Sequence, residues 1–250
     1  MACALIVVAT AEVEACPLPF ETLNGPVARV ELWRYDVTFQ FGTPTEAWAS
    51  HTCEWYDSSG SNFRTIEYSE DGSVEKKWVR GFDEQGLLIQ QDYYEHDGPR
   101  LQWMLVEYFD DRARHAKYDS EGTLLDISDT FPDGRIQQYD LETGAVALEY
   151  IEECNDLGER TLLYVYEGNG DLFMKTQSTF DVDGMDLHDQ SWMYFSGVPC
   201  LMTDYWFEIT ATDSRGNWTE KRRYIQEERA GGTRFVLDGV ARRTIEYHEP

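Results

Sequence analysis

The sequence predicts an all-β protein, a repetitive antiparallel meander that forms a long curled sheet, a partial coil or an open barrel. Short polar turns ending in glycine recur at intervals of 10 to 14 residues, with one doubled interval of 24. The segments between them are rich in β-branched and aromatic residues that often alternate with polar ones, as half-buried strands require. The pentapeptide Arg-Thr-Ile-Glu-Tyr also occurs twice, at residues 64–68 and 243–247. Over about 200 residues this spacing predicts roughly sixteen strands.

Residues 1–16 are predicted to be a truncated signal peptide. An apolar run over residues 3–8 is followed by small residues that fit a cleavage pattern, although the usual basic start is missing. We therefore expect a secreted, periplasmic or cell-envelope protein. The alternative is that this segment forms a buried N-terminal strand.

Residues 17–55 are less regular and are predicted to form N-terminal capping strands. They include one clear strand over residues 32–39. Terminal repeats commonly depart from a consensus because one sheet edge has to be protected. The regular spacing occupies residues 56–250, which we assign to a repeat domain.

The turns of the repeat domain combine an aromatic residue, acidic residues and a closing glycine. Gly60, Gly86 and Gly122 occupy positions where a tight reversal needs a positive φ, which glycine adopts without steric cost. Tyr56 and Tyr118 come directly before two of these turns. They should therefore lie at strand ends and have a structural role, packing each repeat against the next.

These turns resemble the repeat unit of the YD-repeat or Rhs-like family, Tyr-Asp-x-x-Gly. Residues 56–60 (Tyr-Asp-Ser-Ser-Gly) and 118–122 (Tyr-Asp-Ser-Glu-Gly) match it directly, and 82–86 (Phe-Asp-Glu-Gln-Gly) is an aromatic variant. The resemblance implies a β-sheet wall, which in large members coils into a shell around a toxin or forms a cell-surface scaffold. Because this chain is too short for a complete shell, we expect a short member without a toxin domain.

Apart from Cys3 in the apolar run of the leader, the chain has four cysteines, namely Cys16, Cys53, Cys154 and Cys200. An even number suits a secreted disulfide protein, and three connectivities are open. The most local one pairs Cys16 with Cys53 and Cys154 with Cys200. The alternative is four small buried apolar side chains, a common role of cysteine.

The composition argues against several classes of partner. The chain has 47 acidic and 21 basic residues, so its formal net charge is −26. We therefore expect no nucleic-acid binding through a basic face and no binding to an anionic membrane surface. No run of 18 apolar residues occurs, so no transmembrane segment is expected.

No recognisable catalytic motif is present, and neither an enzyme nor a cofactor is expected. The five histidines are dispersed and none belongs to a nucleophile motif. Asp181, Asp183 and Asp186 surround a glycine turn and resemble an oxygen-ligand loop for calcium, which takes six to eight oxygens. The EF-hand spacing is not met, so one more acidic turn is the favoured interpretation.

The function that these observations favour is a scaffold or binding module for carbohydrate or protein. Trp78, Trp103 and Trp192 are the predicted contact residues, because mid-strand aromatic rings on a rigid sheet suit such partners. One alternative is an acidic, immunity-type partner of a polymorphic toxin, since the negative charge suits a basic nuclease. A second is a carbohydrate-active enzyme that uses acidic residues in a groove.

Overall fold

The computed structural model describes residues 23–40, 43–155, 160–180, 186–229 and 232–249. Within these residues it contains sixteen β-strands in an antiparallel meander, which confirms the predicted fold class. Across the same residues there is no helix of the length and apolarity needed to cross a membrane.

The strands follow one another in space in the same order as in the chain. They are β1 (Val27–Gln40), β2 (Thr43–Tyr56), β3 (Asn62–Tyr68), β4 (Val74–Phe82), β5 (Leu88–Glu95), β6 (Arg100–Tyr108), β7 (Ala113–Asp119), β8 (Leu124–Thr130), β9 (Arg135–Tyr139), β10 (Val146–Cys154), β11 (Arg160–Glu167), β12 (Leu172–Phe180), β13 (Asp186–Phe195), β14 (Val198–Thr212), β15 (Trp218–Arg229) and β16 (Gly232–Tyr247).

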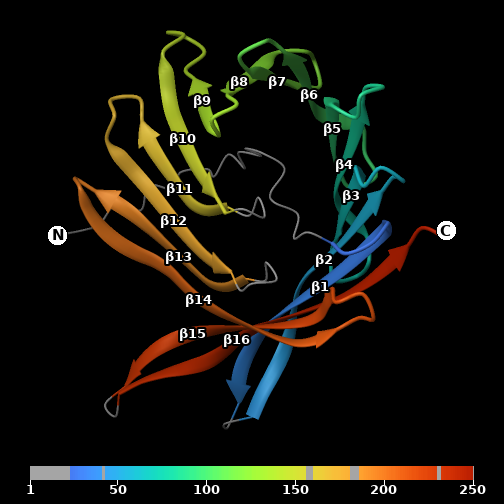
Figure 1. Cartoon of the computed structure of the whole chain (residues 1–250), viewed down its shortest axis with the longest axis vertical. Helices are drawn as coiled ribbons and strands as arrows, with labels where there is room; N and C mark the ends of the chain where they lie inside the picture. The colour runs from blue at the N-terminus through green and yellow to red at the C-terminus, as the bar shows by residue number, and fades with distance from the viewer. Residues whose placement is uncertain (1–22, 41–42, 156–159, 181–185, 230–231, 250) are drawn as a thin grey trace.

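The sheet closes into a barrel because β1 pairs with β16 as well as with β2 (Figure 1). In this seam Val30 lies opposite Ile245, and Trp33 lies opposite Arg242. The expectation of a long curled sheet or a partial coil is therefore wrong, and the barrel is closed where an open one was the third expectation. An open meander would leave two edges of unpaired N–H and C=O groups, and pairing the first strand with the last removes both. The segment predicted to cap the repeats contributes β1 and β2 to the barrel wall.

The turn glycines adopt the predicted left-handed backbone. The φ angle is 90° at Gly60, 82° at Gly86 and 88° at Gly122. In the first of these turns the Asp57 carboxylate accepts hydrogen bonds from two later backbone N–H groups, at 2.9 and 3.0 Å. The aspartate of the other two turns makes the same pair of bonds. The acidic and glycine residues of the repeat therefore build the reversals.

Strand alternation and register divide the wall into two faces, which we name after two β1 residues, the Trp33 face and the Val30 face. Two small buried clusters lie largely on the Val30 face, one at β9–β11 and one at the seam. Their buried members are Ile136, Tyr150, Leu163 and Val165 in the first, and Val27, Val30 and Tyr56 in the second. Most other wall side chains are only half-buried.

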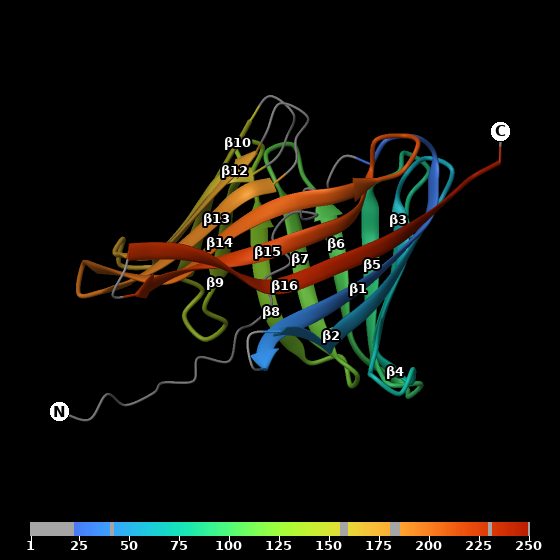
Figure 2. The ribbon, with the colours of Figure 1, turned by 90° about the horizontal axis from the view of Figure 1, so that it is seen from below.

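The strands near the seam are longer than the rest. β1, β2, β14, β15 and β16 have 12 to 16 residues, whereas the other strands have 5 to 10. The pairing of β1 with β16 ends at Asp36 and Gly239, after which each strand pairs only with its hairpin partner. The long hairpins therefore extend beyond the common wall, as the ends of β14, β15 and β16 at the left of Figure 2 show.

Candidate binding face

The three tryptophans predicted to contact a ligand do not form one site. Trp78 in β4 lies on the Val30 face, with its ring 5.5 Å from that of Tyr93. Trp103 in β6 and Trp192 in β13 lie on the Trp33 face but are seven strands apart. Trp103 also stacks on Tyr118 of β7, with 4.4 Å between ring centroids. A cation lies 5.2 Å from the ring centroid of each of these two, Arg100 at Trp103 and Lys175 at Trp192.

A mixed aromatic and polar surface surrounds Trp192 on the Trp33 face. We define this β12–β14 patch by Lys175 and Gln177 of β12, His188, Gln190 and Trp192 of β13, and Asp204 and Trp206 of β14. With strands about 4.8 Å apart and a rise of about 3.3 Å per residue, the patch is about 10 Å wide and 13 Å long. It therefore combines flat apolar rings with hydrogen-bonding groups on a rigid sheet.

One end of the patch is organised by a cation between two rings. Lys175 lies opposite Tyr164 of β11 on one side and opposite Trp192 on the other. Its Nζ is 5.8 Å from the Tyr164 ring centroid and 5.2 Å from that of Trp192. Lys175 Nζ also donates a hydrogen bond to Gln177 Oε1 at 3.2 Å. These contacts hold the half-buried Trp192 ring in one orientation.

At the other end of the patch, a histidine ring contacts an aspartate and stacks on an exposed tryptophan. His188 Nε2 lies 2.5 Å from Asp204 Oδ1, and the His188 ring stacks on Trp206 with a centroid distance of 3.9 Å. Trp206 is 38% exposed, and Phe235 of β16 contacts its edge at 5.3 Å. Sequence reasoning missed these residues, because only the cross-strand register brings the dispersed His188 to Asp204 and Trp206.

A second aromatic row crosses β1 to β3 on the same face. The ring of His51 stacks between Trp33 and Tyr68, with centroid distances of 5.0 and 4.9 Å. His51 Nε2 also lies 2.9 Å from Glu31 Oε1. The central His51 ring has a stacked ring on each side, so the row is better suited to stiffening the wall than to receiving a ligand.

Tyr56 and Tyr118 lie at strand ends, where the turn spacing predicts them. Tyr56 is buried, and its hydroxyl donates to Glu54 Oε2 at 2.6 Å. Burial, together with the Glu54 carboxylate, raises the pKa of Tyr56 well above its ordinary value, so its hydroxyl stays protonated. Tyr118 is half-buried against Trp103. Both positions suit the packing role expected for them, which stays a prediction.

A buried ionic cluster on β7 to β9 is the strongest polar feature outside the patch. Asp129 is only 2% exposed and accepts two bonds from Arg114, both at 2.8 Å, and one from the Tyr139 hydroxyl at 3.0 Å. Arg112 Nε lies 3.2 Å from the same carboxylate. Burial alone would raise the pKa of Asp129, but the bonds from Arg114 and Tyr139 outweigh it and lower the pKa. This network links three strands.

The cysteines do not form the predicted pair. Cys53, Cys154 and Cys200 are free, with Cys53 buried and the other two exposed, and Cys16 lies outside the described residues. Cys154 ends β10 and Cys200 lies in β14, so three strands separate them. Four strand spacings amount to about 19 Å, far beyond the ~7 Å that a disulfide spans between Cα atoms. The pairing of Cys154 with Cys200 is therefore wrong.

The described residues contain no group of three or more His, Cys, Asp or Glu side chains arranged to hold a metal ion. Of the predicted calcium ligands, Asp181 and Asp183 lie outside the described residues, and Asp186 is described only through its backbone at the start of β13.

Comparisons with known proteins do not assign the chain to a family. No protein-family model and no curated protein matches it. Among solved structures it is similar to a porin-like protein from Bacteroides uniformis, at 14% identity and a TM-score of 0.40 over 90% of this chain and 99% of that one. It is also similar to TcdB2-TccC3-TEV, at 11% identity and a TM-score of 0.20 over 87% of this chain and 17% of that one. Likenesses this weak carry no functional argument, and the resemblance to YD-repeat proteins stays a prediction.

Proposed function

We propose that this protein is a non-enzymatic, secreted or cell-envelope binding module that takes carbohydrate on the β12–β14 patch. The observation that carries the proposal is the grouping of Trp192 and the exposed Trp206 with Lys175, Gln190 and the His188–Asp204 pair. Aromatic rings offer a flat apolar surface for sugar rings, and the polar side chains offer the donors and acceptors that hydroxyl groups need.

The barrel supports this role by holding the patch rigid. Trp192, Lys175 and Trp206 each belong to a strand that is paired on both sides at their level. Ligand binding therefore orders few side chains, which lowers the entropic penalty of association. The Lys175 ammonium at one end of the patch and the His188–Asp204 contact at the other restrict the rings further.

The distribution of charge supports a wall with water on both sides. Arg242 pairs with Glu46 on the Trp33 face through side chains that are 40% and 38% exposed, and Lys117 lies opposite Asp126 on the Val30 face. A barrel wall embedded in lipid carries an apolar band on its outer face instead. An aqueous extracellular, periplasmic or surface environment therefore fits the wall better than the interior of a bilayer.

The test is retention on insoluble polysaccharide. The full chain is incubated with cellulose, chitin and peptidoglycan particles, and the bound fraction is measured after centrifugation. Trp192→Ala and Trp206→Ala should each weaken retention about fivefold or more, because each removes a stacking ring worth about 1–3 kcal/mol. Trp78→Ala is the matched control, since Trp78 is a half-buried mid-strand tryptophan on the opposite face.

Retention of none of these polymers, or equal losses in all three variants, would overturn the carbohydrate proposal. Salt-sensitive binding to a basic protein that is unaffected by both patch variants would favour the immunity-type function, which the net charge of −26 suits. Release of soluble sugar from a retained polymer would favour the carbohydrate-active enzyme.

A further inference from the structure

One segment of this acidic chain is both uncharged and strongly apolar. Residues 190–203 contain no Asp, Glu, Lys or Arg over 14 positions, although charged residues make up 27% of the sequence. This segment comprises the end of β13, a two-residue turn and the start of β14. We call residues 194–202 the β13–β14 tip.

The tip exposes apolar side chains on both faces of the hairpin. Phe195 and Val198 lie opposite each other on the Val30 face and are 58% and 66% exposed, the two largest values among the large apolar side chains described. Leu201 on the Trp33 face is 49% exposed, and Met202 at the adjoining bulge is 53% exposed. Hydrophobic surface therefore surrounds the hairpin instead of forming one flat patch.

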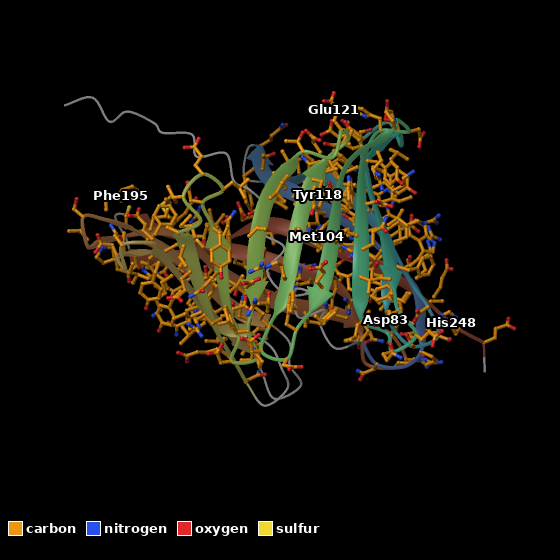
Figure 3. The ribbon with its side chains drawn as sticks, turned by 90° about the horizontal axis from the view of Figure 1, so that it is seen from above. Asp83, Met104, Tyr118, Glu121, Phe195 and His248 are labelled. Carbon is orange, nitrogen blue, oxygen red and sulfur yellow. The ribbon has the colours of Figure 1, made fainter. Side chains whose placement is uncertain are left out.

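The tip is tightly turned and projects from the wall. Ser196 and Gly197 have φ angles of 52° and 77°, the two positive values that a type I′ hairpin turn requires. Within the described ladders, β12 pairs with β13 only as far as Met193, and β15 pairs with β14 only from Tyr205 onward. The residues between these limits pair only within the hairpin. Figure 3 shows Phe195 at the far left end of the molecule.

We propose that the β13–β14 tip inserts into the outer layer of a zwitterionic lipid bilayer and anchors the protein at the membrane surface. A flat protein partner would cover one face of the hairpin, whereas immersion in lipid covers both faces and the turn. A second copy of the chain would also cover only one face of the hairpin, and the exposed apolar area is too small for a stable dimer interface. Phe195, Val198, Leu201 and Met202 expose roughly 450 Å² together, against about 800 Å² per partner in a stable interface.

From the tip toward the barrel wall, the side chains change from apolar to aromatic to charged, as the environment does from the lipid interior to water. Trp192 and Tyr194 lie within three residues of Phe195 on its N-terminal side, at the level where aromatic residues gather at membrane interfaces. Along the hairpin itself, charged residues return only at Asp189 and Asp204, and Lys175 of the neighbouring β12 lies beside Trp192. A net charge of −26 excludes attraction to anionic lipid, so apolar insertion has to supply the affinity.

Vesicle flotation tests this proposal. The full chain is mixed with phosphatidylcholine vesicles at millimolar lipid, and the fraction that floats is measured at low and high salt. We expect binding that 0.5 M NaCl does not reduce, and weaker binding when one third of the lipid is phosphatidylserine. The Phe195→Ser/Val198→Ser variant should lower the partition coefficient at least tenfold. The matched control is Leu125→Ser/Leu141→Ser, which changes two exposed leucines elsewhere on the barrel without changing the charge.

The melting temperature of both double variants should match that of the parent, because all four side chains are substantially exposed. No flotation of the parent chain on phosphatidylcholine, or equal losses in the two double variants, would overturn the proposal. A concentration-dependent dimer in light scattering that Phe195→Ser/Val198→Ser abolishes, without any lipid binding, would assign the tip to a second copy instead.

Discussion

Replacement of Asp129 by alanine should produce the largest loss of stability of any single exchange in the β7–β9 wall. The carboxylate is almost fully buried and is shared by Arg114, Arg112 and Tyr139. Removing one partner of a buried ion pair commonly costs about 3–5 kcal/mol, because it leaves an uncompensated charge. The Arg112 and Arg114 side chains are 29% and 35% exposed, so water can partly replace the lost carboxylate.

We therefore expect a loss of about 2–3 kcal/mol, at or just below the lower end of that range. For a chain of this size such a loss lowers the melting temperature by about 4–12 °C. The measurement is thermal unfolding followed by circular dichroism at pH 7. Asp133→Ala is the matched control, since the Asp133 side chain is 62% exposed and its ion pair with Arg135 is long, at 3.6 Å. Equal melting of Asp129→Ala and the parent would refute the assignment of this cluster as an anchor.

The pH dependence of the same exchange is a second readout. Because the folded state lowers the pKa of Asp129, its contribution is present above the unfolded pKa of about 3.9 and is lost as pH falls through the lower folded pKa. The difference in melting temperature between parent and Asp129→Ala should therefore be largest near neutral pH and shrink below about pH 4. A difference that grows on acidification would contradict this reasoning.

Three further exchanges test the turns, the aromatic rows and the seam. Tyr118→Ala should lower the melting temperature by several degrees, since it removes the half-buried ring that stacks on Trp103. Phe39→Ala, at a residue that is 49% exposed at a strand end, should change the melting temperature little. Equal decreases in the two variants would contradict the packing role of Tyr118. Gly122→Ala should lower the free energy of unfolding, measured by chemical denaturation, by about 1–2 kcal/mol, because φ is 88° at this position. Gly81→Ala should leave this free energy nearly unchanged, because Gly81 has ordinary backbone angles and room for a methyl group. Glu46→Gln should lower the free energy of unfolding by up to about 1 kcal/mol at pH 7, because it weakens the bidentate hydrogen bonds that Arg242 donates at 2.7 and 2.8 Å. Arg242 lowers the pKa of Glu46, so this loss should shrink as the pH falls through that lowered pKa, and a loss that grows on acidification would count against the seam contact.

The turn spacing predicted the strands well because each reversal is encoded locally. The strand expected at residues 32–39 lies within β1, and the aspartates and glycines of the turns make the bonds and angles that such turns require. Composition alone could not indicate which residues meet across strands. His188, Asp204 and Trp206 are brought together by a register that depends on a bulge after Ser191 in the β13–β14 ladder.

The repeated pentapeptide shows why faces could not be predicted from the sequence. Ile66 in the first copy lies opposite Cys53 on the Trp33 face, whereas Ile245 in the second lies opposite Val30 on the other face. Register shifts interrupt almost every ladder, and only β6–β7 and β8–β9 run without one in the part of the chain that the structure describes. Cys53 in turn lies opposite Glu31, the residue after Val30 in β1, so the two copies differ in pairing register by one residue and their identical sequences have opposite orientations.

Closure of the barrel depends on contacts between the two ends of the described chain. Asn217, 2% exposed in the β14–β15 turn, accepts a bond from the Asn24 backbone N–H at 2.7 Å and donates to the Asn24 carbonyl at 3.0 Å. Arg29 donates to Glu246 at 3.1 Å in the adjoining seam. The length-dependent entropy of closing a loop rises only as the logarithm of its length, about 5 kcal/mol for the roughly 220 residues from β1 to β16. Nine residue pairs join these two strands, and each backbone hydrogen bond contributes about 0.5–1.5 kcal/mol. A meander this long therefore favours closing on itself over leaving two edges exposed, although no single repeat encodes the closed form.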